Sequence, residues 1–294
     1  MSKPSTKSSG KAIGLVTENP WQALKQFTSA RIALGRAGTS IPTQQLLPFQ
    51  LDHARAIDAV HKALAVESLI EQLQASSIIQ KYTKHAPMLV SSKANDRMTY
   101  LQRPDLGRQL CEASWQSLLK HREKSSQEYD LAIVVADGLS STAIQRHAAP
   151  VIESLVTKLT KDDKYSWSLA PLTIVTQGRV AVGDDVGECL KAKITLILIG
   201  ERPGLTSPDS MGIYITWNPK RGAKDSSRNC ISNIRPEGLC YEEASHKAFY
   251  LLTESMKTKC TGIGLKDRSL VVEDSTNLES NPKSQFLVSA AKDK

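Results

Sequence analysis

The sequence lacks any apolar run long enough to cross a membrane. Its longest clean apolar stretch, residues 194–200, has the length of a strand, whereas a membrane helix needs about 20 such residues. Residues 1–11 are polar and basic, without the apolar centre of a secretory signal. We therefore expect a protein with no membrane partner and no export signal.

Paired cysteines and metal-binding spacings are also missing. The five cysteines are widely separated and form no Cys-x-x-Cys pair, and the six histidines are scattered. This pattern favours reduced thiols in a cytoplasmic protein over a disulfide framework or a zinc site. We predict no metal ligands in this chain.

Aromatic residues are few, at 5%, and no RNA-recognition or zinc-finger signature occurs. The net charge of +8 is concentrated in residues 1–38, which carry +5, so the other 256 residues carry only +3. A basic leader on a nearly neutral body is typical of a mobile or docking segment. The charge distribution argues against a nucleic-acid partner.

The usual catalytic fingerprints are absent as well. There is no Gly-x-Gly-x-x-Gly, no P-loop and no Gly-x-Ser-x-Gly, so Ser140 is not identified as a hydrolase nucleophile. Asp137 follows an apolar stretch and fits two roles equally well, a catalytic carboxylate or a cap on the next helix. The pattern alone assigns no catalytic residue.

The composition divides the chain into four parts. Residues 1–18 predict a disordered basic leader, 19–122 a smaller helical N-terminal domain, 123–266 an α/β domain and 267–294 a polar tail.

Within the helical part, breaks are predicted near residues 35–43 and 84–97, and a further helix is predicted from 103–105 through 119.

In the second half, apolar strand-like runs alternate with helical segments. We predict strands at residues 131–136, 172–176, 194–200, 212–217 and 228–234, and helices beginning near Pro150 and spanning 183–192 and 241–259. This alternation predicts an α/β fold with a Rossmann-like, mostly parallel sheet and helices on both faces.

Three loops follow predicted strands and should share one edge of that sheet: residues 137–140, 178–180 and 200–204. Ligands of open α/β sheets bind beyond the carboxyl ends of the strands. Val180 and Glu201 are thereby candidate ligand contacts. Cys230 joins them only if the chain returns to this edge, and otherwise it is a small apolar filler.

Several motifs in fixed order carry a resemblance to a known family. They are Arg-Pro-Asp-x-Gly-Arg at 103–108, Ala-Asp-Gly-Leu-Ser at 136–140, Gly-Glu-Arg-Pro-Gly-Leu at 200–205 and Cys-Ile-Ser-Asn-Ile at 230–234. Gly-Arg-Ala-Gly at 35–38, Pro-Thr at 42–43 and Asp-His-Ala at 52–54 precede them. Together they resemble the small (light) subunit of ethanolamine ammonia-lyase, over roughly residues 20–264.

The resemblance implies an adenosylcobalamin-dependent lyase that converts ethanolamine to acetaldehyde and ammonia by radical chemistry. It implies a substrate site in the large subunit, no catalytic residue in this chain and cobalamin contacts at Val180, Glu201 and Cys230. These three would position the cofactor by hydrogen bonding and packing. Because no Asp-x-His-x-x-Gly motif occurs, we expect cobalamin to keep its own benzimidazole as lower ligand.

The resemblance also implies a hetero-oligomer of several large and small subunit pairs. Two alternatives stay open: a stand-alone Rossmann-like binder of a nucleotide or other phosphate ligand, and a structural partner that never touches the cofactor. Loss of cobalamin affinity in Glu201→Ala with assembly intact would exclude the second. A further hypothesis is that the basic leader addresses the enzyme to a bacterial microcompartment.

Overall fold

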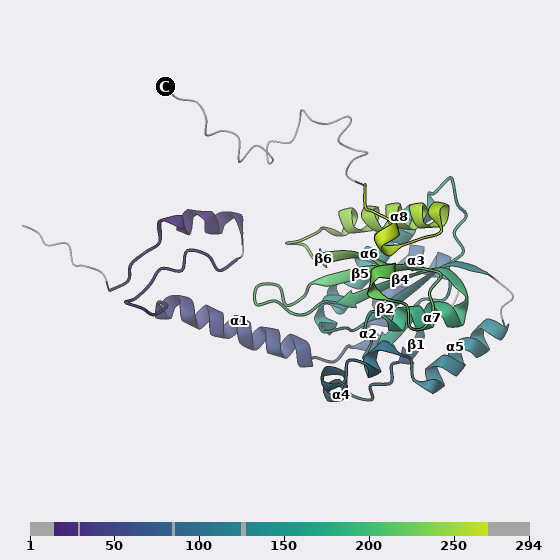
Figure 1. Ribbon diagram of the computed structural model, residues 1–294, viewed down its shortest axis with the longest axis horizontal. Helices are drawn as coiled ribbons and strands as arrows, with labels where there is room; N and C mark the ends of the chain where they lie inside the picture. The colour runs from purple at the N-terminus through teal and green to yellow at the C-terminus, as the bar shows by residue number, and fades with distance from the viewer. Residues whose placement is uncertain (1–14, 29, 84–85, 125–127, 270–294) are drawn as a thin grey trace, which may run out of the picture.

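A six-stranded mixed sheet forms the centre of the computed structural model, which describes residues 15–28, 30–83, 86–124 and 128–269 (Figure 1). The strands are β1 (Met88–Ser91), β2 (Tyr129–Ala136), β3 (Thr173–Thr176), β4 (Ala192–Gly200), β5 (Met211–Trp217) and β6 (Arg228–Ile234). Their order is β1-β3-β2-β4-β5-β6; the first four are mutually parallel, and β5 is antiparallel to both β4 and β6.

Helices cover both faces of the sheet. The α-helices are α1 (Thr43–His61), α2 (Val66–Ala75), α3 (Ser77–Thr83), α4 (Arg97–Gln102), α5 (Glu112–Lys124), α6 (Ser141–Thr160), α7 (Val182–Leu190) and α8 (Tyr241–Thr258). Short 3-10 helices are η1 (Pro20–Phe27), η2 (Leu106–Arg108), η3 (Asp225–Ser227) and η4 (Gly262–Gly264).

Two apolar cores, one on each face, explain the continuous apolar strands. In β2, Leu131, Ile133 and Val135 enter a core shared with α2, α3, α6 and α8. The alternate residues Ala132 and Val134 enter the core shared with α5 and α7. A strand covered on both sides needs apolar residues at every position, and the predicted α/β class is confirmed on this basis.

The predicted parallel character holds for only part of the sheet. Ten residues separate β4 from β5, and no helix lies between them. A parallel return needs a crossover of a dozen or more residues, whereas so short a connection permits an antiparallel neighbour. β5 therefore runs antiparallel to β4, which corrects the expectation of a mostly parallel Rossmann-like sheet.

The helical N-terminal domain expected over residues 19–122 is not confirmed. β1 lies within this range and pairs with β3 as the edge strand of the sheet. Leu69, Leu73 and Ile79 of α2 and α3 belong to the same core as β2. Most of the basic leader and of the polar tail, residues 1–14 and 270–294, lies outside the described residues.

Two predicted helix starts are wrong. α6 begins at Ser141, where Ser140 caps it by accepting from the Ala143 amide, so Pro150 lies inside the helix. The segment after Arg103 forms only η2, and α5 begins later, at Glu112.

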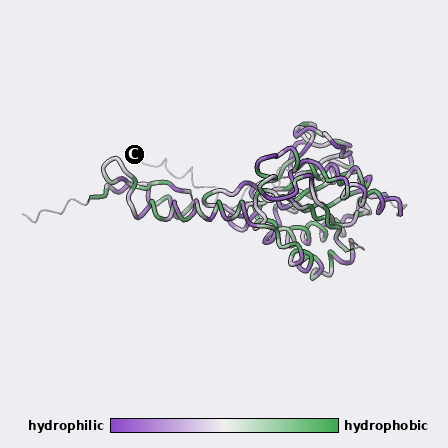
Figure 2. Tube along the Cα trace, turned by 90° about the horizontal axis from the view of Figure 1, so that it is seen from below, coloured by the Kyte–Doolittle hydropathy of each residue, from purple (hydrophilic) through white to green (hydrophobic). Residues whose placement is uncertain are grey.

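An arm projects from this body, formed by residues 15–28 and 30–61 and ending in the long helix α1 (Figures 1 and 2). Its base is fixed by Arg97, whose Nε donates to the Val60 carbonyl oxygen at 2.7 Å, and by the Ser141 hydroxyl, which donates to the Lys62 carbonyl. No helix among the described residues is long and apolar enough to span a membrane.

Candidate functional site

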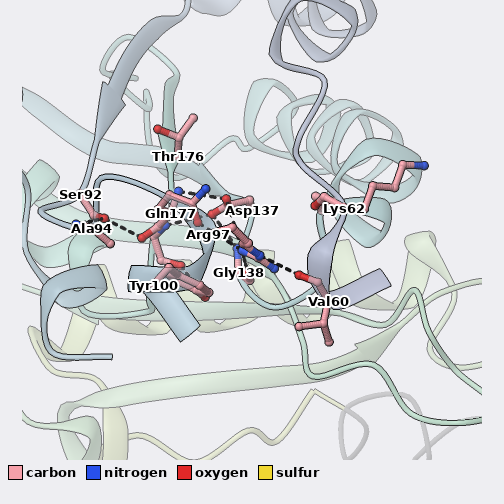
Figure 3. A network of polar contacts seen from close by, with 12 residues as sticks. Val60, Lys62, Ser92, Ala94, Arg97, Tyr100, Asp137, Gly138, Thr176 and Gln177 are labelled. Carbon is pink, nitrogen blue, oxygen red and sulfur yellow. Dashed lines mark hydrogen bonds and ion pairs between the residues drawn. The ribbon is translucent and has the colours of Figure 1, made fainter. Parts of the chain in front are cut away.

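The loops after β2 and β3 are bound together by one carboxylate. Asp137 accepts from the backbone amides of Gly138, Gln177 and Gly178, each at 2.9 Å (Figure 3). Its side chain is 4% exposed and lies 3.6 Å from Arg97 Nη1. Burial raises the pKa of this carboxyl, while the three amides and Arg97 act in the opposite direction.

Asp137 therefore does not act as the cap of α6, one of the two roles that the sequence left open. The cap of α6 is Ser140, and the Asp137 carboxylate is engaged by the protein itself. Its work is structural: it fixes the backbone of the loop at 177–180, which leads to Val180.

The loops after β2 and β4 also interlock. The Leu139 amide donates to the Gly200 carbonyl at 2.9 Å. A Cβ on Gly200 would lie 2.0 Å from the Ser140 carbonyl oxygen, so only glycine permits this approach. The predicted convergence of three loops at one sheet edge is thus confirmed for the loops after β2, β3 and β4.

Tyr100 contacts the loop at 178–180 through Gly178 and Arg179. Its ring lies between the guanidinium groups of Arg97 and Arg179, 4.7 and 4.2 Å from the ring centroid, and its hydroxyl donates to the Gly178 carbonyl. Burial raises the pKa of this phenol, so it stays protonated. Gly107 completes the contact, because its carbonyl accepts from the Arg179 amide at 2.7 Å and a Cβ there would meet Arg179 Cγ.

Beyond this loop lies a cavity of about 400 Å³, which we call the arginine cavity. It is lined by Arg108, Arg179, Val180, Ala181, Tyr214, Asp225, Arg228 and Cys230. Tyr214 and Cys230 face each other across β5 and β6, on the side where α7 packs over β2 and β4. The cavity therefore lies on the sheet surface beside the start of α7.

Ion pairs fix the inner wall of the arginine cavity. The Arg228 guanidinium, 2% exposed, pairs with the equally buried Asp184 of α7 and with Asp225. Arg221 pairs with Asp185 at 2.6 Å. Burial raises the pKa of Asp184, and the Arg228 charge opposes this. Asp184 and Asp185, which lie in the first turn of α7, are thus partners of arginines as well as of the helix dipole.

The structure brings Val180 and Cys230 to one cavity but places Glu201 outside its lining. The Glu201 carboxylate accepts from the hydroxyls of Ser210 and Ser232 and, at 3.2 Å, from the Asn233 amide. A bulge in β6 makes this possible, since Asn233 has φ +61° and the pairing with β5 shifts there. Glu201 thereby ties the end of β4 to β6.

Cys230 is exposed and forms a hydrogen bond with Tyr214. Partial desolvation raises the pKa of its thiol, and the Glu201 charge raises it further. A protonated thiol is a weak nucleophile and a soft packing surface. The chain does return toward the predicted edge, because β6 runs in the same direction as β4.

Sequence reasoning did not assign six residues of the cavity to the site: Arg108, Arg179, Ala181, Tyr214, Asp225 and Arg228. Tyr214 carried a signal, since it alternates with Ile213 and Ile215, which enter the core of the opposite face. Arg179 lies in the loop at 178–180 that was predicted at the ligand edge. Arg108 and Arg228 carried no signal, because only the fold brings their distant segments together. Among the described residues, no group of three or more His, Cys, Asp or Glu is arranged to hold a metal ion.

Comparison with known proteins places this arrangement in a family. The profile of the family described as "Ethanolamine ammonia-lyase light chain (EutC)" matches residues 18–266. The chain belongs to the ethanolamine ammonia-lyase light-chain family. The match includes the loops at 137–140, 177–180 and 200–205 and all residues that line the arginine cavity.

Curated members of this light-chain family are similar along nearly their whole length. The ethanolamine ammonia-lyase small subunit of Ralstonia nicotianae is 51% identical over 256 residues, covering 87% of this chain and 91% of that protein. That of Azotobacter vinelandii is 50% identical over 255 residues, with 87% and 91% covered. That of Pseudomonas putida is 48% identical over 271 residues, with 92% and 96% covered.

Proposed function

We propose that this chain is the small subunit of an adenosylcobalamin-dependent ethanolamine ammonia-lyase. The complex would convert ethanolamine to acetaldehyde and ammonia, with this chain holding the cofactor against a large subunit that carries the substrate site. The observation that carries the proposal is the family match over residues 18–266, which contains the complete arginine cavity.

The residues present fit a corrinoid in part. Val180 and Cys230 offer small packing surfaces, and the Nε atoms of Arg179 and Arg228 are buried donors without a hydrogen-bond partner among the described residues. A cavity of about 400 Å³ lies toward the lower end of the roughly 300–1,000 Å³ typical of ligand sites. It admits only a portion of a corrinoid, which in the proposed complex leaves the remainder to the large subunit.

When bound, adenosylcobalamin supplies the radical that starts the reaction, and this chain supplies position and exclusion of water. Val180, held by the loop that Asp137 and Tyr100 fix, would present backbone groups and an isopropyl surface to the cofactor. Cys230 would pack against it as a protonated thiol. Glu201, oriented by Ser210 and Ser232, would use its remaining lone pairs to accept from a cofactor amide or hydroxyl.

The arm is the segment best suited to hold the large subunit. Most of the large apolar side chains that the described residues leave exposed lie on it: Leu15, Val16, Trp21, Phe27, Ile41, Leu47, Phe49, Leu51 and Ile57. Exposed apolar surface on this scale is typical of an interaction site. Arg97 joins the arm to the loop that holds Asp137, so one partner could contact both.

The test is ethanolamine-dependent acetaldehyde formation with adenosylcobalamin and the cognate large subunit, with and without this chain. We expect activity only when both chains are present. Full activity of the large subunit alone would contradict the proposal and favour the stand-alone nucleotide binder. The microcompartment hypothesis is tested separately, by deleting residues 1–14 and following the enzyme through cell fractionation.

A further inference from the structure

One side chain connects the base of the arm to two loops at the edge of the sheet. Arg97, the first residue of α4, donates from Nε to the Val60 carbonyl at 2.7 Å, just before α1 ends (Figure 3). Its Nη1 donates to the Gly138 carbonyl at 2.8 Å, in the loop after β2. The same nitrogen lies 3.5 Å from the Gln177 side-chain oxygen, in the loop after β3. One guanidinium group therefore contacts the arm and both loops.

The geometry of a guanidinium group makes this connection stiff. Its three nitrogens lie in one plane at fixed spacing, so a displacement of Nε with the arm also moves Nη1. Nη1 of Arg97 lies 3.6 Å from the Asp137 carboxylate, and the two side chains are only 13% and 4% exposed. Because a buried carboxylate that loses its cation is costly, Arg97 has one strongly favoured position. The end of the arm is thereby held in a fixed relation to Asp137.

The Asp137 carboxylate extends the connection into the loop at 177–180. The amides of Gln177 and Gly178 both donate to this carboxylate at 2.9 Å. An amide exchanges its hydrogen with water faster where local opening of the structure costs little free energy. The exchange rates of these two amides therefore report how firmly the loop is held.

The described chain by itself holds the arm through a small contact. Among the 19 residues of α1, the buried side chains are those of Ala56 and Ala59. At 1.5 Å per residue the helix is about 28 Å long, so a partner that holds its far end restricts its orientation at the base. Movements of the arm displace the Val60 carbonyl and with it the Nε atom of Arg97. A docked partner would suppress these movements.

We propose that Arg97 is a positioning residue that couples docking of the large subunit on the arm to the order of the loop at 177–180. This inference rests on the proposed function, in which the large subunit holds the arm. Docking restricts the arm, the restricted arm fixes Arg97, and Arg97 fixes Asp137, which holds the two amides of the loop. Coupling between two sites is reciprocal, so a ligand that orders the loop also tightens the association of the subunits.

The test is hydrogen exchange of the loop, followed by mass spectrometry on the full chain with and without the large subunit and with no corrinoid added. The quantity measured is the factor by which docking slows exchange in peptides that contain Gln177 and Gly178. The main variant is Arg97→Lys, which keeps a positive charge beside Asp137 but lacks the planar donors that reach two carbonyl oxygens. We expect a factor of at least about five in the unsubstituted chain and a factor near one in Arg97→Lys.

Two control variants separate coupling from a general loosening of the loop. Tyr100→Phe removes the hydroxyl that donates to the Gly178 carbonyl and leaves the guanidinium group of Arg97 in place. It should raise exchange of the loop equally in the free chain and in the complex, so the factor stays the same. Arg103→Lys, at the other end of α4, alters an exposed ion pair with Asp105 and should change neither rate.

A variant of the arm gives a test that does not depend on how Arg97→Lys folds. Trp21→Ser with Leu47→Ser changes two exposed positions of the arm and is studied at concentrations of the large subunit that saturate assembly. We expect the factor to fall toward one, because the arm is no longer held while the rest of the complex is present.

The other outcomes would overturn the coupling. Slowing that persists in Arg97→Lys or in the arm variant would show that the large subunit covers the loop directly. A factor that falls as much in Tyr100→Phe, or no slowing in the unsubstituted complex, would equally exclude a coupling through Arg97. All of these results leave the proposed function intact, whereas a failure of the unsubstituted chain to bind the large subunit would contradict the proposed function itself.

Discussion

At the scale of single residues, the protein uses charged side chains as fixed parts of the site. The Asp137 carboxylate accepts hydrogen bonds from three backbone amides, and the Glu201 carboxylate accepts from two serine hydroxyls and one backbone amide. Arg228, one of the residues that line the arginine cavity, holds α7 through Asp184. Such groups fix the positions of neighbouring backbone segments.

The pair Arg228–Asp184 gives the first stability prediction. Arg228→Met leaves the Asp184 carboxylate buried beside an apolar side chain, which should lower the free energy of unfolding by about 3–5 kcal/mol. Urea unfolding followed by tryptophan fluorescence measures this. The control is Arg55→Met, which breaks an exposed pair with Asp52 and should cost less than about 0.5 kcal/mol. Equal effects of the two substitutions would show that the buried pair has no special role.

At the scale of elements, most of the sheet could be predicted, because strands buried on both faces appear in the sequence as continuous apolar runs. The predicted strand at 228–234 coincides with β6, and those at 131–136, 172–176, 194–200 and 212–217 lie within two residues of β2 to β5. The helical spacing of apolar residues over 241–259 likewise predicted α8.

Other features of the fold could not be read from the apolar pattern of the sequence. β1 has only four residues, of which Leu89 is 55% exposed, so its pattern is too short and too mixed to reveal a strand. Strand direction is not encoded in apolar pattern, so the antiparallel β5 was missed. Pro150 sits inside α6, where packing of the whole helix outweighs the local penalty.

The candidate site was likewise predicted from the sequence only in part. Val180 and Glu201 lie in loops that follow strands, which placed those loops at the ligand edge, and the family resemblance singled out the two residues within them. The rest of the arginine cavity could not be foreseen, because Arg108 and Arg228 come from segments that only the fold brings next to Arg179.

The junction of α6 and α8 gives a prediction on pH. His147 of α6 is 3% exposed, contacts the Tyr241 hydroxyl at 2.7 Å and lies 3.5 Å from Asp209. Burial lowers its pKa, although Asp209 opposes this. The unfolded chain, with a His pKa of about 6.5, therefore binds more protons than the folded chain as the pH falls below that value.

The stability that the folded protein gains by burying His147 in its neutral form is complete above about pH 6.5. It is lost as the pH falls toward the lowered pKa of His147 in the folded state. His147→Gln should therefore show a smaller drop in urea midpoint between pH 7.5 and pH 5.5 than the unsubstituted protein. An equal or larger drop in the variant would contradict this interpretation.

At the scale of the whole molecule, a packed body carries a projecting arm (Figure 2). Only Ala56 and Ala59 are buried in α1, while its larger apolar side chains face outward. The arm thus adds apolar surface without adding to the core of the chain, which is the balance expected of a subunit completed by its partner.

This balance predicts separable effects on assembly and folding. Trp21→Ser with Leu47→Ser, at positions 65% and 60% exposed, should weaken the complex with the large subunit while hardly changing the unfolding of this chain. Sedimentation of mixed subunits measures the first effect and urea unfolding the second. Ile263→Ser on the body, 86% exposed, is the control and should alter neither. Unchanged assembly in the double variant would exclude the arm as the docking segment.

The most direct test of the account is the affinity of cobalamin for the large subunit, measured by equilibrium dialysis with and without this chain. If the chain holds the cofactor at the subunit interface, adding it should lower the dissociation constant at least about tenfold, which corresponds to roughly 1.4 kcal/mol of added binding energy. An unchanged dissociation constant would contradict the account and leave this chain a structural partner that does not touch the cofactor.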